Sequence, residues 1–251
     1  MTRSGRRASA LVAALEAAGA AVLELPLTRQ IDPSDGGAAL RSAAAGVRGN
    51  RWVVLTSVNA VERFMAVLRD ARALGDVQVA AVGPATADAL RRTGVEPDLV
   101  PARHSAQGLV DEFPSPAPGD PGPPRVLFPG ADLAADTLVE GLGRMGWDVE
   151  RVEAYRTVPL DTPDPHLVAR VAGADALVFG ATSSVRAFSA LRTAEGAPVP
   201  APGLVLCLGP TTAAAVRAAG YDGVHEAPDA SPGATVAVLV DLLGSGADAA
   251  P

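Results

Sequence analysis

The chain has 251 residues, of which 48% are hydrophobic and 20% charged, a composition typical of one large or two small globular domains. All 21 basic residues are Arg, which excludes a Schiff-base lysine, a pyridoxal phosphate anchor and a P-loop lysine. One Cys, three scattered His and a net charge of −7 argue against a disulfide, a built-in metal site and a nucleic-acid partner. No apolar stretch long enough for a membrane span and no signal-peptide pattern is present, so we expect a cytoplasmic protein.

Taken in chain order, the predicted elements form two series that match each other. Each strand-helix unit begins with a short apolar run, such as Val53–Leu55, and continues after a turn with apolar residues at helical spacing. The matched segments are 3–26 with 130–154, 53–68 with 177–191, and 79–94 with 204–220. Strands that alternate with helices favour parallel sheets covered on both faces. We therefore predict an α/β fold with two small parallel sheets flanked by helices.

One strand of the first series has no counterpart in the sequence. The second series opens with the apolar run 125–128, whereas the matching run of the first series would lie before Met1. We expect this first strand to be missing, through either a misplaced start site or a natural truncation. Because its absence would leave apolar surface exposed, adding the upstream coding segment should raise solubility and melting temperature, and equal stability of the two forms would contradict this.

Two stretches stand apart from the repeated units. Residues 25–33 and 154–163 occupy equivalent places, are kept extended by their prolines, and are predicted to lie side by side as connectors. The stretch 114–124 has the composition of a linker, and a surface loop explains it equally well.

Residues 141–146 spell GxGxxG, the dinucleotide-binding pattern. That pattern acts only when its glycines directly follow a strand and open a helix. Here they close a predicted helix, so Gly146 is interpreted as a helix C-terminal cap.

Four turns between a strand and a helix are the better candidates for a binding site. Glycine lets a ligand approach the backbone, and free N–H groups with hydroxyls at a helix start favour an anion. The candidates are Thr56, Ser57 and Asn59; Gly83 and Thr86; Ser183 and Ser184; and Gly209, Thr211 and Thr212. Helix capping explains any one turn alone. Four turns at matched points, all at carboxyl ends of parallel strands, favour a common crevice for a ligand.

The histidines have no Ser or Asp at the spacing of a hydrolase triad, and His104 is interpreted as a loop residue. Tyr155, one of two tyrosines, lies in the second connector and is the natural acid there, although tyrosines more often simply pack between strands. Asp132, Asp136 and Glu140 are predicted to form a solvated acidic face of one helix.

The segments TSVNAVERF, VAAVGPATADAL, RVLFPGADLAADTL, VEAYRT and CLGPTTAAAV, in this order and spacing, resemble the uroporphyrinogen-III synthase family from about Thr2 to Leu243. The resemblance implies two α/β domains joined by two antiparallel connector strands, with the site in the cleft. It places domain one at residues 1–27 plus 161–251 and domain two at 32–155, with connectors 25–33 and 154–163.

The resemblance also implies the reaction. Hydroxymethylbilane, a linear tetrapyrrole with eight carboxylates, is cyclised to uroporphyrinogen III with inversion of ring D and loss of water, without cofactor or metal. Tyr155 matches the family tyrosine that assists departure of the hydroxyl, and the ten turn residues named above would bind substrate. We expect a monomer that takes its substrate in a transient handover from hydroxymethylbilane synthase.

Two positions depart from the family pattern. Gly130 stands where relatives commonly have Arg, and Gly180-Ala181 stands where they have Thr-Ser. The alternative therefore left open is a non-catalytic or regulatory relative that binds a small anionic, tetrapyrrole-like ligand in the interdomain cleft.

Overall fold

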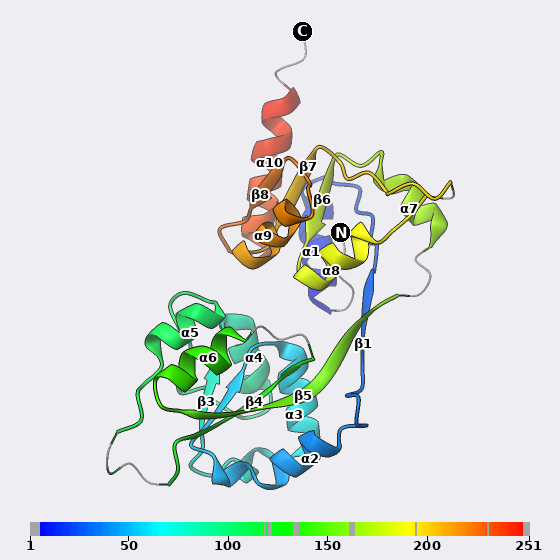
Figure 1. Cartoon of the computed structure of the whole chain (residues 1–251). Helices are drawn as coiled ribbons and strands as arrows, with labels where there is room; N and C mark the ends of the chain where they lie inside the picture. The colour runs from blue at the N-terminus through cyan, green and yellow to red at the C-terminus, as the bar shows by residue number, and fades with distance from the viewer. Residues whose placement is uncertain are drawn as a thin grey trace. The chain divides into compact units, whose positions relative to one another are not determined.

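The chain folds into two compact units in a computed structural model (Figure 1). The structure describes residues 6–117, 119, 122–132, 136–160, 164–193, 195–229 and 231–247. Unit 1 consists of Met1–Arg29 with Val158–Pro251, and unit 2 of Gln30–Thr157. Each unit therefore has its own sheet and its own core.

Unit 2 alternates strands with helices, as the apolar runs and helical spacing predict. Its first and last strands each share two residues with unit 1. In chain order its elements are β1 (Thr28–Ile31), α2 (Ala38–Ala45), the 3-10 turn η1 (Val47–Gly49), β2 (Trp52–Leu55), α3 (Val58–Val67), η2 (Ala71–Ala73), β3 (Gln78–Ala81), α4 (Pro84–Arg92), α5 (Ala106–Glu112), β4 (Arg125–Ala131), α6 (Thr137–Arg144) and β5 (Asp148–Pro159). The strands form one sheet in the order β1-β5-β4-β2-β3.

The sheet of unit 2 is parallel through its centre, with β5, β4, β2 and β3 all in the same direction. All four residues of β2 are buried, as expected for a strand covered on both faces. Val53 and Leu55 pack in the cluster of Phe64 on α3, while Trp52 and Val54 pack in that of Trp147. This two-sided burial follows from the alternation of side chains along a strand. Full burial of each large apolar side chain contributes about 1.5–3 kcal/mol to the free energy of folding.

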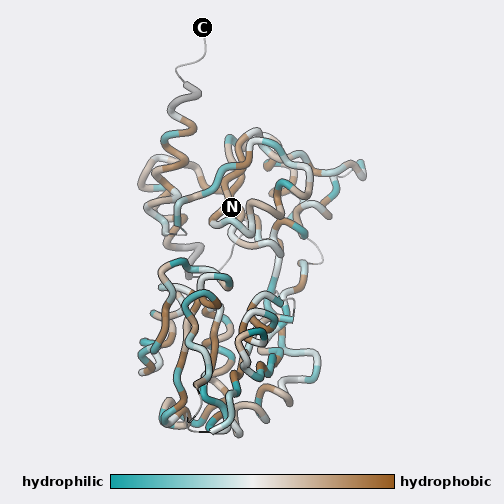
Figure 2. The backbone as a smooth tube through the Cα atoms, turned by 60° about the vertical axis from the view of Figure 1, so that its left-hand side comes forward, coloured by the Kyte–Doolittle hydropathy of each residue, from teal (hydrophilic) through white to brown (hydrophobic). Residues whose placement is uncertain are grey.

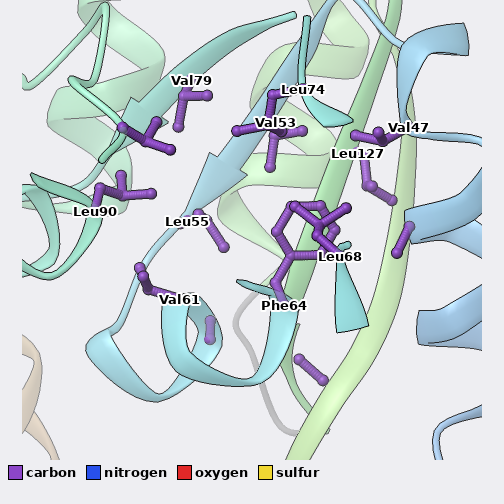
Figure 3. Packing of buried hydrophobic residues seen from close by; sticks show 14 of the residues in the cluster. Val47, Val53, Leu55, Val61, Phe64, Leu68, Leu74, Val79, Leu90 and Leu127 are labelled. Atoms are coloured by element: carbon purple, nitrogen blue, oxygen red, sulfur yellow. The ribbon is translucent and has the colours of Figure 1, made fainter. Parts of the chain in front are cut away.

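Phe64 lies at the centre of the first of these clusters. Figure 3 shows its ring in one cluster with Leu68, the residue that follows the helix, and with Val53 and Leu127 of strands β2 and β4. Val61, Phe64 and Leu68 follow the helical spacing predicted from the sequence, and each is at most 8% exposed. Helix α3 is thereby fixed on the sheet, so that its first turn comes at the carboxyl end of β2.

Unit 1 repeats this arrangement with fewer described strands. Its elements are α1 (Arg6–Ala17), α7 (Pro165–Val171), β6 (Ala176–Phe179), α8 (Thr182–Ser189), β7 (Leu204–Cys207), α9 (Pro210–Ala218), β8 (Val224–Glu226) and α10 (Pro232–Ala247). The described strands form a parallel sheet in the order β6-β7-β8. Figure 2 shows hydrophobic stretches alternating with hydrophilic ones along the chain of both units.

The cores of unit 1 also lie on both sides of its sheet. Phe179 and Phe188 meet edge to face with ring centroids 5.6 Å apart, in the cluster that also buries Leu25 and Leu27. On the other side, Leu11 and Leu15 of α1 pack with Leu239 of α10. The predicted α/β fold with parallel sheets flanked by helices is therefore confirmed.

The connectors are neighbouring strands, because β1 lies beside β5 in the sheet. The N–H of Leu160 donates to the carbonyl of Leu27 (2.9 Å), and Ser34 lies against Glu153. Residue numbers thus rise along one connector as they fall along the other, so the two strands are antiparallel. Residues 161–163 of the predicted second connector lie outside the described residues.

Two further predictions concern loops and chain ends. In the predicted linker-like stretch, residues 114–117 and 122–124 carry no helix or strand, and residues 118, 120 and 121 lie outside the described part. The predicted missing strand would lie before Met1, so nothing in the structure tests it and it stays a prediction. Among the described helices, none combines the length and apolar character that a membrane crossing requires.

Candidate functional site

The turn after β2 holds three of the predicted site residues, Thr56, Ser57 and Asn59. Ser57 is extended and caps α3, because its Oγ accepts a hydrogen bond from the N–H of Ala60 (3.0 Å). The same Oγ lies 3.1 Å from the hydroxyl of Tyr155. Thr56 and Asn59 are half-buried on either side of Ser57.

Tyr155 reaches this turn from β5. It pairs with Ala131 at a register irregularity of the parallel β4–β5 ladder, and its carbonyl accepts from the N–H of Asp132 (3.1 Å). The side chain is 7% exposed and packs in the cluster of Phe64. Tyr155 therefore packs between strands, as tyrosines commonly do, and also presents its hydroxyl to a predicted site residue.

The turn after β3 lies at the same edge of the sheet, because Leu55 pairs with Ala81 in the parallel ladder. Gly83 is the N-terminal cap of α4, with Pro84 at the first helical position. The N–H of Thr86 turns back to the carbonyl of Gly83 (3.0 Å), and the Thr86 side chain is buried, with 4% exposed.

His104 lies beside this turn and was missed by the sequence reasoning, which assigned it only to a loop. It is exposed, and a Cβ added to Gly83 would lie 3.2 Å from the Cβ of His104. No spacing in the sequence signals this contact, because His104 reaches the turn through the loop between α4 and α5.

Unit 1 places the other five predicted residues at the matching edge of its own sheet, where Phe179 pairs with Cys207. Gly209 caps α9 in an extended conformation, and nothing lies within 4 Å of a Cβ added there. Thr211 is exposed and Thr212 is buried. Within the described residues, neither threonine donates its backbone N–H to another group.

The turn before α8 differs from its counterpart in unit 2. Its N-cap position holds Ala181, and no side chain caps the helix. Capping by a hydroxyl side chain, the alternative explanation of such a turn, therefore does not apply here, because alanine occupies the place that Ser57 fills in unit 2. Ser183 is half-buried, and Ser184 is buried inside the first turn of α8.

The GxGxxG stretch ends helix α6, as predicted. Gly146 has a left-handed φ of 97°, and the N–H of Trp147 donates to the carbonyl of Leu142 (3.1 Å), which is the bond pattern of a glycine helix end. Gly141 serves packing, since a Cβ there would meet the side chain of Val110 at 2.6 Å. The stretch therefore has a structural explanation that needs no dinucleotide.

The predicted acidic face of one helix is wrong in part. Asp132 precedes α6 and accepts from the N–H of Thr157 (3.3 Å), and Asp136 is the residue before the helix, paired with Arg151 (2.8 Å). Only Glu140 lies in α6 itself, because the helix begins at Thr137.

Cys207, the one cysteine of the chain, ends β7 two residues before Gly209. Burial raises the pKa of the Cys207 thiol to about 11, which makes it a poor nucleophile. No group of three or more His, Cys, Asp or Glu side chains suited to a metal ion occurs among the described residues. Cavities of about 410 Å³ in unit 2 and about 700 Å³ in unit 1 have none of the predicted site residues in their walls.

Together, the paired connectors and the parallel strands followed by helices define a two-unit α/β protein, a class of fold in which ligands commonly bind at the carboxyl ends of the strands. The particular family is given by sequence. Residues 9–237 match the family model described as uroporphyrinogen-III synthase HemD, and the chain belongs to this family.

Individual relatives agree with the family model. The chain is 34% identical to the uroporphyrinogen-III synthase of Synechococcus elongatus, over 76% of this chain and 72% of that protein. It is 26% identical to the chloroplastic uroporphyrinogen-III synthase of Oryza sativa subsp. japonica, over 90% of this chain and 74% of that protein. A crystal structure of a mutant uroporphyrinogen III synthase from the extremely thermophilic bacterium Thermus thermophilus has the same fold, with a TM-score of 0.62, 22% identity, and coverage of 96% of this chain and 97% of that one.

Proposed function

We propose that this chain is a uroporphyrinogen-III synthase that cyclises hydroxymethylbilane to uroporphyrinogen III with inversion of ring D and loss of water. The observation that carries the proposal is the contact of the Tyr155 hydroxyl with Ser57 (3.1 Å), in the turn at the carboxyl end of β2. In a chain of this family, that contact supports Tyr155 as a proton donor beside groups suited to hold a carboxylate.

Binding of the substrate relies on local donors. The chain carries a net charge of −7, so a broad positive field cannot attract a ligand with eight carboxylates. The N–H groups of Thr211 and Thr212 at the start of α9, with open space over Gly209, suit a carboxylate. In unit 2, the side chains of Thr56 and Asn59 in the turn after β2 supply further donors.

Tyr155 acts as the general acid of the first step. Its phenolic proton passes to the terminal hydroxyl of the substrate. The carbon–oxygen bond then breaks, water departs, and an azafulvene is formed. The far pyrrole then attacks through its substituted carbon to give a spiro intermediate, which fragments and recloses with ring D inverted. The reclosed ring finally loses a proton, which restores the proton that Tyr155 gave up in the first step. The overall reaction therefore consumes no proton.

Product identity depends on positioning. Without an enzyme the azafulvene closes directly to the uninverted isomer, so the protein must hold the chain folded while it stabilises developing charge. The test is therefore the isomer formed from hydroxymethylbilane. A binding module without chemistry would bind the tetrapyrrole and yield the uninverted isomer alone.

We also propose the oligomeric state of the protein, its location and the source of its substrate. A monomer in the cytoplasm would receive hydroxymethylbilane directly from hydroxymethylbilane synthase, because free substrate closes without inversion. Sedimentation of the purified chain at micromolar concentration should give a single species of about 25.2 kDa. A stable dimer would contradict the monomer.

A further inference from the structure

The hydroxyl of Ser57 has two protein partners, and their geometry limits what it can do. It accepts from the N–H of Ala60 (3.0 Å) and contacts the Tyr155 hydroxyl (3.1 Å). A serine hydroxyl has one proton and two acceptor positions. The N–H of Ala60 occupies one acceptor position, which leaves the other, or the proton, for Tyr155.

The two possible directions of the Ser57–Tyr155 bond have different consequences. If Tyr155 donates to Ser57, the phenolic proton points into the protein and cannot reach a substrate. If Ser57 donates to Tyr155, the phenolic proton is free to point away from the turn. Only the second direction is compatible with Tyr155 as a general acid.

We infer that Ser57 is a positioning residue, which donates its proton to Tyr155 and links that phenol to the amino terminus of α3. The inference rests on the proposed function and goes beyond it, since the sequence assigned Ser57 to substrate binding. The bonds run in one direction, from the Ala60 N–H to Ser57 Oγ and from the Ser57 proton to the Tyr155 oxygen.

This chain of bonds strengthens as Tyr155 gives up its proton. Negative charge then develops on the phenolic oxygen, and a hydrogen bond to a charged acceptor is about twice as strong as one to a neutral acceptor. Bonds in series polarise one another, and the amino terminus of α3 favours nearby negative charge. Ser57 therefore contributes to the transition state more than to substrate binding.

The experiment combines substitutions of Ser57 with Tyr155→Phe. Ser57→Ala and Ser57→Gly both remove the hydroxyl, and Gly is well tolerated at a helix N-cap. We expect each to lower kcat roughly tenfold, a modest part of the effect of a general acid, with KM changed less than about twofold. Ser57→Thr, which keeps a hydroxyl, should restore most of the activity.

The double variants separate positioning from substrate contact. If Ser57 acts through Tyr155, Ser57→Ala should lower kcat no further once Tyr155 is Phe. An equal loss in both backgrounds, or an effect on KM alone, would overturn the inference. Ser105→Ala is the matched control, because Ser105 caps α5 with the same geometry, accepting from Gly108 N–H at 3.0 Å; it should leave kcat unchanged.

A measurement without turnover keeps this inference separate from the proposed function. The chain has two tyrosines, so Tyr155 alone can be observed in a Tyr221→Phe background. The tyrosine doublet in the Raman spectrum should report a phenol that accepts a hydrogen bond, and the signal should change in Ser57→Ala. A phenol that donates to Ser57, or a spectrum unaffected by the substitution, would overturn the inference even if the enzyme is active.

Discussion

The hydroxyls of Ser57 and Tyr155, 98 positions apart in the chain, lie 3.1 Å from each other. The contact joins the cap of α3 to the part of strand β5 that belongs to the second connector. A residue that belongs to a connector strand is thus tied to the turn where a ligand is expected.

Tyr155→Phe should lower kcat by roughly 10²-fold, the lower range for a general acid, because the proton donor is lost and the ring remains. Since one partly buried hydrogen bond disappears, the free energy of unfolding should fall by only about 1 kcal/mol. Steady-state kinetics and urea unfolding measure both. The control is Tyr221→Phe, which removes the hydrogen bond to Ser189 (3.1 Å) in unit 1. Full activity of Tyr155→Phe would exclude Tyr155 from the mechanism.

Gly209→Ala should raise KM roughly fivefold, equivalent to about 1 kcal/mol, because a methyl group would stand where a carboxylate approaches the start of α9. Nothing lies within 4 Å of the added Cβ, so folding should be unaffected. Gly203→Ala at the opposite end of β7 is equally open and should leave KM as it is. An unchanged KM in Gly209→Ala would remove this turn from the binding site.

Gly146→Ala should destabilise the protein by about 1 kcal/mol, because alanine is strained at a φ of 97°. Gly143→Ala, in the same helix with open space around it, should stabilise by about 0.5 kcal/mol through its better helix propensity. Thermal unfolding of the two variants measures the difference. Equal effects would contradict the assignment of Gly146 to the helix end, and neither variant should change KM.

Stability should depend on the thiol of Cys207 at alkaline pH. Burial raises its pKa from 9.0 to about 11, so the folded state holds the proton more tightly than the unfolded state. The contribution of the protonated thiol to the free energy of unfolding is therefore present in full below pH 9.0 and is lost as the pH rises through about 11. Relative to Cys207→Ala, the free energy of unfolding should fall by about 2 kcal/mol across this window, and parallel pH profiles would contradict the prediction.

The sequence predicted those parts of the fold that depend on local pattern. The run Val53–Leu55 is apolar throughout because β2 is covered on both faces, and Val61 and Phe64 recur at helical spacing because α3 packs on the sheet. Gly146 was assigned correctly because the glycine at a helix end is itself a local signal.

The remaining features depend on contacts between distant residues or on a single substitution. Asp132 and Asp136 were placed in a helix because their spacing suits one, but α6 begins only at Thr137. The departure at Ala181 was visible in the sequence, and its structural effect is that α8 lacks the side-chain cap that Ser57 gives α3. His104 and Ser57 reach their partners through loop and strand placement, which periodicity does not encode.

The most direct test of the proposed function is the isomer composition of the product. Hydroxymethylbilane is generated in place by hydroxymethylbilane synthase, the purified chain is added, and the oxidised porphyrins are separated by chromatography. The wild-type chain and Gly203→Ala should give mainly the type III isomer, whereas Tyr155→Phe should give mainly type I, because unassisted closure then competes. Exclusive formation of type I by the wild-type chain, at protein concentrations that bind the tetrapyrrole, would contradict the proposed function.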